Sequence, residues 1–224
     1  MTYAEYIAYH KRGDAGVEER MIASLARRLR LTEWDAFRLI YFYAMTYHIP
    51  SALDMLRGER NIKKLKFRTD RRYVRCNGAY GEMLARLDGN MYYRLDAVDT
   101  TQRAYDEVRK WYFFGRYAAF MFLEVYVNTF KPKWTDNVMF GWEPDENYTK
   151  GAELITGSAD LATLNRFLEN AKRDTQDNAF AIETSLCAVA KFAKGTRWDG
   201  YYAERMLSDA AGTRWADLIY SLAK

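Results

Sequence analysis

The sequence predicts a mainly α-helical fold, arranged as a single domain of 224 residues. Apolar side chains recur at helical spacing along most of the chain, as in Trp34, Phe37 and Tyr41. Only three prolines occur, so long helices are rarely interrupted. A chain of this length can bury a substantial core, and no internal repeat or obvious linker divides it.

The N-terminal quarter is predicted to lead into a central buried helix. Helical patterns cover residues 2–11 and 17–30. A cap signal at Thr32 begins a third helix, which is apolar nearly all round between residues 39 and 47. Such a helix is typical of a buried position, and Pro50 ends it before a further short helix.

The rest of the chain is predicted to be helical outside two segments. Residues 101–130 are expected to be helical with a break or kink at Gly115, and residues 131–147 are interpreted as a loop. The other predicted helices cover residues 79–87, 148–156, 159–173, 178–194, 200–210 and 213–223. Residues 60–76 alternate imperfectly, a pattern compatible with a small β-hairpin around Thr69 to Arg71.

The composition favours a cytoplasmic protein without a membrane span. The apolar stretch 111–130 contains Arg116 and Glu124, which are costly in hydrocarbon, so a buried core helix is the better interpretation. Cys76 and Cys187 form no CxxC pair, which favours a reducing compartment. The N-terminal residues also lack the apolar core of a signal peptide.

One segment, residues 57–75, concentrates positive charge. It contains nine basic side chains and two acidic ones, a net charge of +7 within a chain of +4, so the remainder is slightly acidic. The basic residues are Arg57, Arg60, Lys63, Lys64, Lys66, Arg68, Arg71, Arg72 and Arg75. With Phe67 and Tyr73 between them, they predict a DNA-contacting excursion at about residues 57–76. The alternative is an ordinary solvated basic loop.

Several common catalytic motifs are absent from the sequence. It has no phosphate-binding GxxxxGK[ST] loop, no GxGxxG after a strand, no HExxH and no Cys/His cluster for zinc. No metal site and no required cofactor are therefore predicted. With His10 and His48 as the only histidines, any chemistry must depend chiefly on carboxylates, arginines, lysines and tyrosines.

Charges within apolar helices are the main candidates for chemistry. Arg116 and Glu124 are separated by about 80° around a helix, so both can face one cavity. They form either a structural ion pair or an anion site in which Glu124 orients the guanidinium. Glu183 and Lys191 lie on one face of a later helix, where they are either site residues or ordinary surface residues.

The central helix offers polar groups with two interpretations. His48 is more often a core histidine than a catalyst, and the same holds for Tyr41, Tyr43 and Tyr47. Three tyrosines on one central helix can nevertheless place hydroxyl groups into a pocket.

Three segments share a further pattern: residues 37–56 (FRLIYFYAMTYHIPSALDML), 113–120 (FFGRYAAF) and 182–206 (IETSLCAVAKFAKGTRWDGYYAERM). Together they resemble a bacteriophage helical family that hypermodifies thymine in DNA. The family includes amino acid:DNA transferases, α-glutamyl/putrescinyl-thymine pyrophosphorylases and the helical domain of 5-hydroxymethyluracil DNA kinases. The resemblance implies that an amine from an amino acid or polyamine displaces pyrophosphate from 5-pyrophosphoryloxymethyluracil in double-stranded DNA. The base would have to leave the helical stack for this reaction.

The resemblance and the needs of this reaction select the site residues. A general base, cations for the pyrophosphate and aromatic faces near the methylene carbon are required. The catalytic candidates are Glu183, Glu124, Arg116, Arg205, Tyr43 and Tyr202. The substrate-binding candidates are Tyr47, His48, Lys191 and Arg38. A divalent cation could accompany the pyrophosphate. The alternatives are a noncatalytic helical DNA-binding module and, less favoured, a base-excision enzyme, for which no helix-hairpin-helix turn is found.

Overall fold

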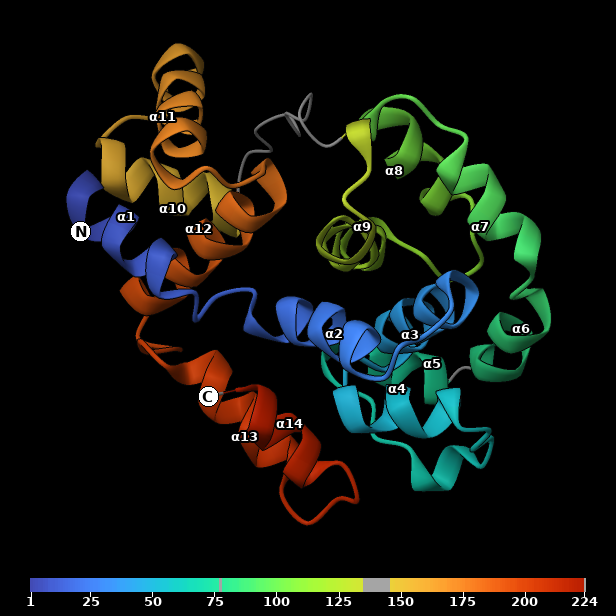
Figure 1. Ribbon diagram of the computed structural model, residues 1–224. Helices are drawn as coiled ribbons and strands as arrows, with labels where there is room; N and C mark the ends of the chain where they lie inside the picture. Colours follow the sequence, from blue (N-terminus) through green and yellow to red (C-terminus); the bar gives the residue numbers. More distant parts are fainter. Residues whose placement is uncertain (77, 135–145, 224) are drawn as a thin grey trace. The chain divides into compact units, whose positions relative to one another are not determined.

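The computed structural model describes residues 1–76, 78–134 and 146–223, and these ranges consist of helices joined by turns (Figure 1). No strand occurs within them, which confirms the mainly α prediction. Contacts group the chain into two compact units. Unit 1 comprises Met1–Val17 and Asp136–Arg205, and unit 2 comprises Glu18–Thr135 and Met206–Lys224. The single-domain organisation stays a prediction.

Unit 1 is a cluster of helices around an apolar core. Its helices are α1 (Tyr3–Arg12), α10 (Asn147–Thr156), α11 (Leu161–Thr175), α12 (Ala179–Ala193) and the part of α13 (Tyr201–Ala210) up to Arg205. A capping box joins Thr2 and Glu5 at the start of α1, and Asn178 caps α12. Tyr6, Phe167 and Leu186 are among the buried side chains that hold the helices together.

Helices α10 and α12 approach each other closely at Gly151. A β-carbon at this position would lie 2.1 Å from the backbone oxygen of Leu186. Only a residue without a side chain fits there, and this contact fixes how closely the two helices pack.

Unit 2 is built around α3. Its helices are α2 (Val17–Arg28, from Glu18 onward), α3 (Glu33–Thr46), α4 (Ile49–Leu56), α5 (Arg72–Cys76), α6 (Ala79–Arg86), α7 (Gly89–Asp96), α8 (Thr101–Arg109), α9 (Arg116–Phe130) and α14 (Ala216–Leu222), with the end of α13. Figure 1 shows α6, α7 and α8 following one another around α3 and α9. Phe37 is fully buried and contacts the rings of Trp111 and Phe122, so aromatic packing joins α3 to α9.

The predicted β-hairpin in residues 60–76 is not formed. The segment contains two single 3-10 turns, η1 (Ile62–Lys64) and η2 (Thr69–Arg71), followed by α5. Its backbone donors bind to α3 and α4 instead of to a second strand. The Lys66 N–H donates to Ser51 Oγ at 2.8 Å, and the Arg68 N–H donates to the Thr46 carbonyl at 2.9 Å. Because these groups are already satisfied, strand pairing is not needed.

Other sequence predictions are confirmed in part. The expected break near Gly115 is present, since α8 ends at Arg109 and Gly115 is the N-cap residue of α9. Helix α9 is the buried core helix expected at its position, and none of the described helices has the length and apolar character to cross a bilayer. The predicted loop at 131–147 lies mostly outside the described residues.

Candidate functional site

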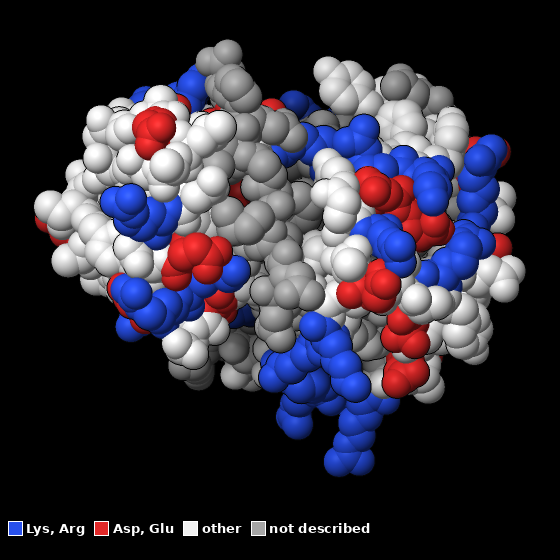
Figure 2. Space-filling model, turned by 90° about the horizontal axis from the view of Figure 1, so that it is seen from above, with Lys and Arg blue, Asp and Glu red and all other residues white. Residues whose placement is uncertain are grey.

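Positive charge on the surface is informative where it is not balanced by nearby acids. On the face shown in Figure 2, Lys and Arg side chains form several groups, and many of them lie beside Asp and Glu. Among the described residues, Arg86 pairs with Glu82 at 2.6 Å, and Arg103 pairs with Asp99 at 2.9 Å. Exposed pairs of this kind add little positive potential.

The nine cations of the basic segment fall into two groups in unit 2. Arg68 forms an ion pair with Asp209, and Arg71 is buried with Nη1 donating to the Phe113 carbonyl at 3.2 Å. These two guanidinium groups are therefore used within the fold. The exposed cations of the segment are Arg57, Arg60, Lys63, Lys64, Lys66, Arg72 and Arg75.

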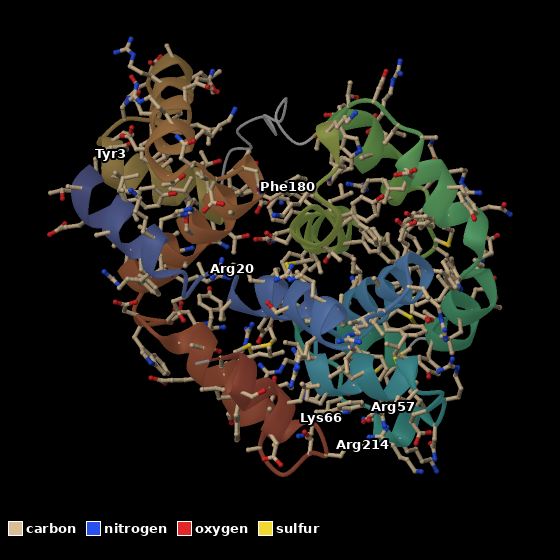
Figure 3. All side chains as sticks on the ribbon, viewed as in Figure 1. Tyr3, Arg20, Arg57, Lys66, Phe180 and Arg214 are labelled. Carbon is tan, nitrogen blue, oxygen red and sulfur yellow. The ribbon has the colours of Figure 1, made fainter. Side chains whose placement is uncertain are left out.

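Arg57 is held against the C-terminal part of unit 2. Its guanidinium lies 4.7 Å from the ring of Trp215, which also contacts Arg214 at 5.1 Å. Asp54 accepts from Trp215 Nε1 at 2.8 Å and pairs with Arg214 at 2.7 Å. Figure 3 labels Arg57, Lys66 and Arg214 in the same region of unit 2. Arg214, from far along the chain, thus lies beside Arg57, with its own charge paired to Asp54.

Four exposed cations of the segment have neither an ion pair nor an aromatic ring contact within the described ranges: Lys63, Lys66, Arg72 and Arg75. By contrast, Lys64 pairs with Glu59 at 3.2 Å, and the Arg60 guanidinium lies 5.5 Å from the Phe42 ring. Tyr73, between Arg72 and Arg75, is 62% exposed. This combination of unbalanced cations and an exposed ring can contact a nucleic-acid backbone and stack on a base.

The tyrosines predicted as site residues on α3 lie in a polar part of the unit 2 core. Tyr43 is fully buried, and its hydroxyl lies 2.9 Å from Glu18 and 3.3 Å from Glu19. The Tyr47 ring contacts Tyr43 and, on α9, Tyr117 at a centroid distance of 5.9 Å. The sequence patterns did not single out Glu18 and Glu19, because both lie in an ordinary-looking acidic first turn.

Arg116 and Glu124 both lie on α9, as the sequence predicts. Arg116 begins the helix, whereas Glu124 is 1% exposed in its middle. A carboxylate at this depth requires a polar environment to stay charged. Arg38, a predicted substrate ligand, pairs with Asp35 one turn earlier at 2.8 Å.

His48 has a structural role at the start of α4. Its Nδ1 accepts from the Ser51 N–H at 3.2 Å, which places the ring proton on Nε2. Nε2 faces Asp209 Oδ1 at 3.5 Å, too far for a good hydrogen bond, so this contact is mainly electrostatic. Burial acts to raise the pKa of Asp209, but His48 and Arg68 outweigh it and lower the pKa below the ordinary 3.8.

In unit 1, α12 carries a second histidine network that the sequence did not reveal. His10 Nδ1 lies 2.9 Å from Ser185 Oγ, and His10 Nε2 lies 2.9 Å from Asp177. Ser185 is 1% exposed and also bonds to Tyr6 at 2.8 Å. These are the residue types of a hydrolytic triad, but the serine is enclosed by the core and has no open side for a substrate. The network joins α1 to α12.

Three predicted residues, Lys191, Arg205 and Tyr202, come together in unit 1. The Arg205 guanidinium lies 5.2 Å from the Tyr202 ring and 5.7 Å from the Tyr201 ring. Arg197, which is not among the site residues expected from the sequence, lies 4.2 Å from the same Tyr201 ring. Its Nε is buried and has no hydrogen-bond partner among the described residues.

The pKa of the Lys191 ammonium group reflects the positive charge of its neighbours. Burial is the largest cause that lowers the pKa of its ammonium group below 10.5. The nearby Cys187 opposes this effect, and Arg197, Arg205 and Lys194 lower the pKa further. Several cations thus surround one half-buried ammonium, an arrangement that favours the binding of an anion.

A buried aspartate positions this group of side chains. We call the group the Lys191 cluster, and its members are Lys191, Lys194, Arg197, Tyr201, Tyr202 and Arg205. Asp14 accepts from the Gly200 N–H at 3.2 Å and the Ala203 N–H at 2.9 Å, which caps the start of α13. Glu183 lies on α12, two turns before Lys191, and is 7% exposed. Trp198 is 54% exposed beside the cluster and contacts the Tyr201 ring.

The described residues contain no group of His, Cys, Asp and Glu side chains suited to a metal ion. A comparison of the sequence with protein-family models finds no match, and neither does a comparison with curated proteins.

Proposed function

We propose that the protein is a DNA-modifying transferase that replaces the pyrophosphate of 5-pyrophosphoryloxymethyluracil in DNA with an amine. The observation that carries the proposal is the Lys191 cluster, in which Lys194, Arg197 and Arg205 act on the half-buried ammonium group of Lys191. These cations suit the leaving pyrophosphate. The buried carboxylate of Glu183, two turns earlier on α12, is the candidate base for the amine. The resemblance to thymine-hypermodifying proteins supplies the substrate.

The reaction is a displacement at the 5-methylene carbon of the base. The nitrogen of the amine donor forms a bond to this carbon as the carbon–oxygen bond breaks, and pyrophosphate leaves with the electron pair. Lys191, Arg197 and Arg205 are assigned to the pyrophosphate. Glu183 is assigned as the base that takes a proton from the ammonium group of the donor, which gives the free amine that attacks. Trp198 offers an exposed ring on which the extruded base can stack.

DNA binding is assigned to the exposed cations of the basic segment in unit 2. Their interaction with phosphates does not depend on sequence, and they set affinity without taking part in the chemistry. This surface also supports a second candidate function, a noncatalytic DNA-binding module, which needs only the cations and not the Lys191 cluster.

The two functions are separated by a transfer assay. The protein is incubated with DNA carrying pyrophosphorylated hydroxymethyluracil and a panel of amino acids and polyamines, and the nucleosides are analysed by mass spectrometry. We expect a new nucleoside with at least one donor. We expect Glu183→Gln and Arg205→Ala each to lower the rate by about 10²- to 10³-fold. Glu169→Gln, at an exposed acid on α11 outside the Lys191 cluster, is the matched control and should retain the rate.

If DNA binds but no donor gives a product, the binding-module function replaces the proposal. If product forms at full rate in both variants, the transferase activity stands and the assignment of the site to the Lys191 cluster is wrong.

A further inference from the structure

Unit 2 contains a pocket between the start of α3 and the start of α7 that the proposed reaction does not use. Its volume is about 600 Å³. It is lined by Thr32, Glu33, Trp34, Gly89, Tyr92 and Tyr93. Three of these side chains are aromatic, one is a carboxylate and none is basic, a composition opposite to that of the Lys191 cluster.

The core of unit 2 holds two of the three rings in place. Trp34 stacks on the buried Phe37 at a centroid distance of 5.6 Å, and Tyr92 meets Phe37 edge-on at 5.5 Å. Tyr93 contacts Tyr92 at 5.6 Å and is 69% exposed, so it forms the outer wall. The aromatic faces are therefore preorganised before any ligand arrives.

The pocket is negatively charged. Glu33 Oε2 accepts from the Tyr92 hydroxyl at 3.0 Å, and no ion pair to Glu33 occurs in the part of the chain that the structure describes. Burial is the largest cause that raises the pKa of Tyr92, and the bond and charge of Glu33, followed by the charge of Asp96, raise it further. The negative charges of Glu33 and Asp96 create an electrostatic field at the Tyr92 ring that disfavours an added negative charge and favours a cation.

We propose that this pocket binds an organic ammonium ion, with its charge over the aromatic faces and beside the Glu33 carboxylate. Cations are attracted to the faces of Trp and Tyr rings, and the attraction strengthens where water is partly excluded. Anionic ligands are repelled by Glu33, and a neutral aromatic ligand would gain only the ring contacts. The site uses none of the residues assigned to the transfer reaction, so it can be tested independently of that function.

The test compares a cation with a neutral molecule of nearly the same shape. Tetramethylammonium chloride and tert-butanol are titrated separately into the full-length protein, and binding is followed by saturation-transfer difference NMR at constant ionic strength. We expect saturable binding of tetramethylammonium and much weaker binding of tert-butanol. Tyr93→Ala and Glu33→Gln should each raise the Kd for tetramethylammonium by about 2- to 30-fold.

Two further variants keep the test specific. Tyr93→Phe retains an aromatic face and should bind tetramethylammonium nearly as well as the parent protein. Tyr112→Ala removes a tyrosine that is 38% exposed on the same unit but outside the pocket, and it should not change the Kd. Thermal melting verifies that each variant is folded. Equal binding of tert-butanol, or a Kd unchanged in both Tyr93→Ala and Glu33→Gln, would overturn the proposal.

Discussion

Asp209 balances two positively polarised side chains that come from different parts of unit 2. Arg68 forms an ion pair with it, and the Nε2 side of His48 faces it at 3.5 Å. The Asp209 side chain is only 13% exposed, so its charge is poorly solvated without these neighbours. The contact attaches the basic segment and the start of α4 to α13.

Asp209→Asn should therefore destabilise the protein in a pH-dependent way. The folded-state pKa of Asp209 lies below 3.8, so its stabilisation is complete above about pH 4 and is lost as the pH falls through the folded-state pKa. We expect a loss of about 1.5–3 kcal/mol in the free energy of unfolding at pH 7, measured by urea denaturation.

The same measurement at low pH supplies the control. Below the folded-state pKa the parent protein also has a neutral side chain at position 209, so the two proteins should differ little. A difference that stays constant from pH 7 to pH 3 would show that the cost comes from packing and not from the charge.

At the scale of elements, the position of α12 is determined by its packing on α10 and by the His10 network. Gly151 leaves no room for a side chain opposite Leu186, and Ser185 is joined to His10 on α1. Glu183 and Lys191 lie on this same helix, so a shift of α12 would displace both groups of the candidate site.

Gly151→Ala should destabilise unit 1 by about 1–3 kcal/mol, because the new methyl group collides with backbone and the helices must separate. Denaturant unfolding monitored by circular dichroism gives the value. Gly81→Ala is the matched control, since Gly81 is also helical but has nothing within 4 Å of an added β-carbon. We expect it to be neutral or stabilising by about 0.5–1 kcal/mol. Equal effects of the two substitutions would contradict the close-packing explanation.

For the molecule as a whole, the net charge of +4 conceals two surfaces of different character. Apart from Lys64, which pairs with Glu59, the exposed cations of the basic segment lack acidic partners among the described residues, whereas cations such as Arg86 and Arg103 are paired. DNA affinity should therefore depend on only part of the positive charge.

Replacing Lys63, Lys66, Arg72 and Arg75 with Gln should weaken DNA binding and reduce its dependence on salt. Each phosphate contact adds about 0.9 to the slope of log K against log salt, so removing four should lower the slope by about 3 to 4. Fluorescence anisotropy with duplex DNA at several salt concentrations measures this slope. Arg86→Gln with Arg103→Gln is the control, and we expect a much smaller change. The control removes two charges and the variant four, so an equal fall per removed charge would mean that binding follows total charge and not the basic segment.

Much of the fold follows from local sequence signals, whereas the grouping of side chains does not. Helical periodicity and caps such as Thr32 predicted the helices, and the all-round apolar character of α3 predicted its burial. The hairpin prediction was wrong because Ser51 and Thr46, distant in sequence, take the backbone hydrogen bonds of the segment. The sequence predicted only Lys191, Arg205 and Tyr202 of the Lys191 cluster. Arg197 was missed because its place in the cluster depends on a contact with the Tyr201 ring, which no local pattern reveals.

The division of the chain has a consequence for synthesis. Each unit combines two separate stretches of chain, so neither is complete until late in translation. Helix α1 leaves the ribosome early, but its partners α11 and α12 begin roughly 150 residues later. At about 5–20 residues per second this is a wait of roughly 8–30 s. During that interval Tyr6 and Tyr9 are exposed to solvent and to chaperones.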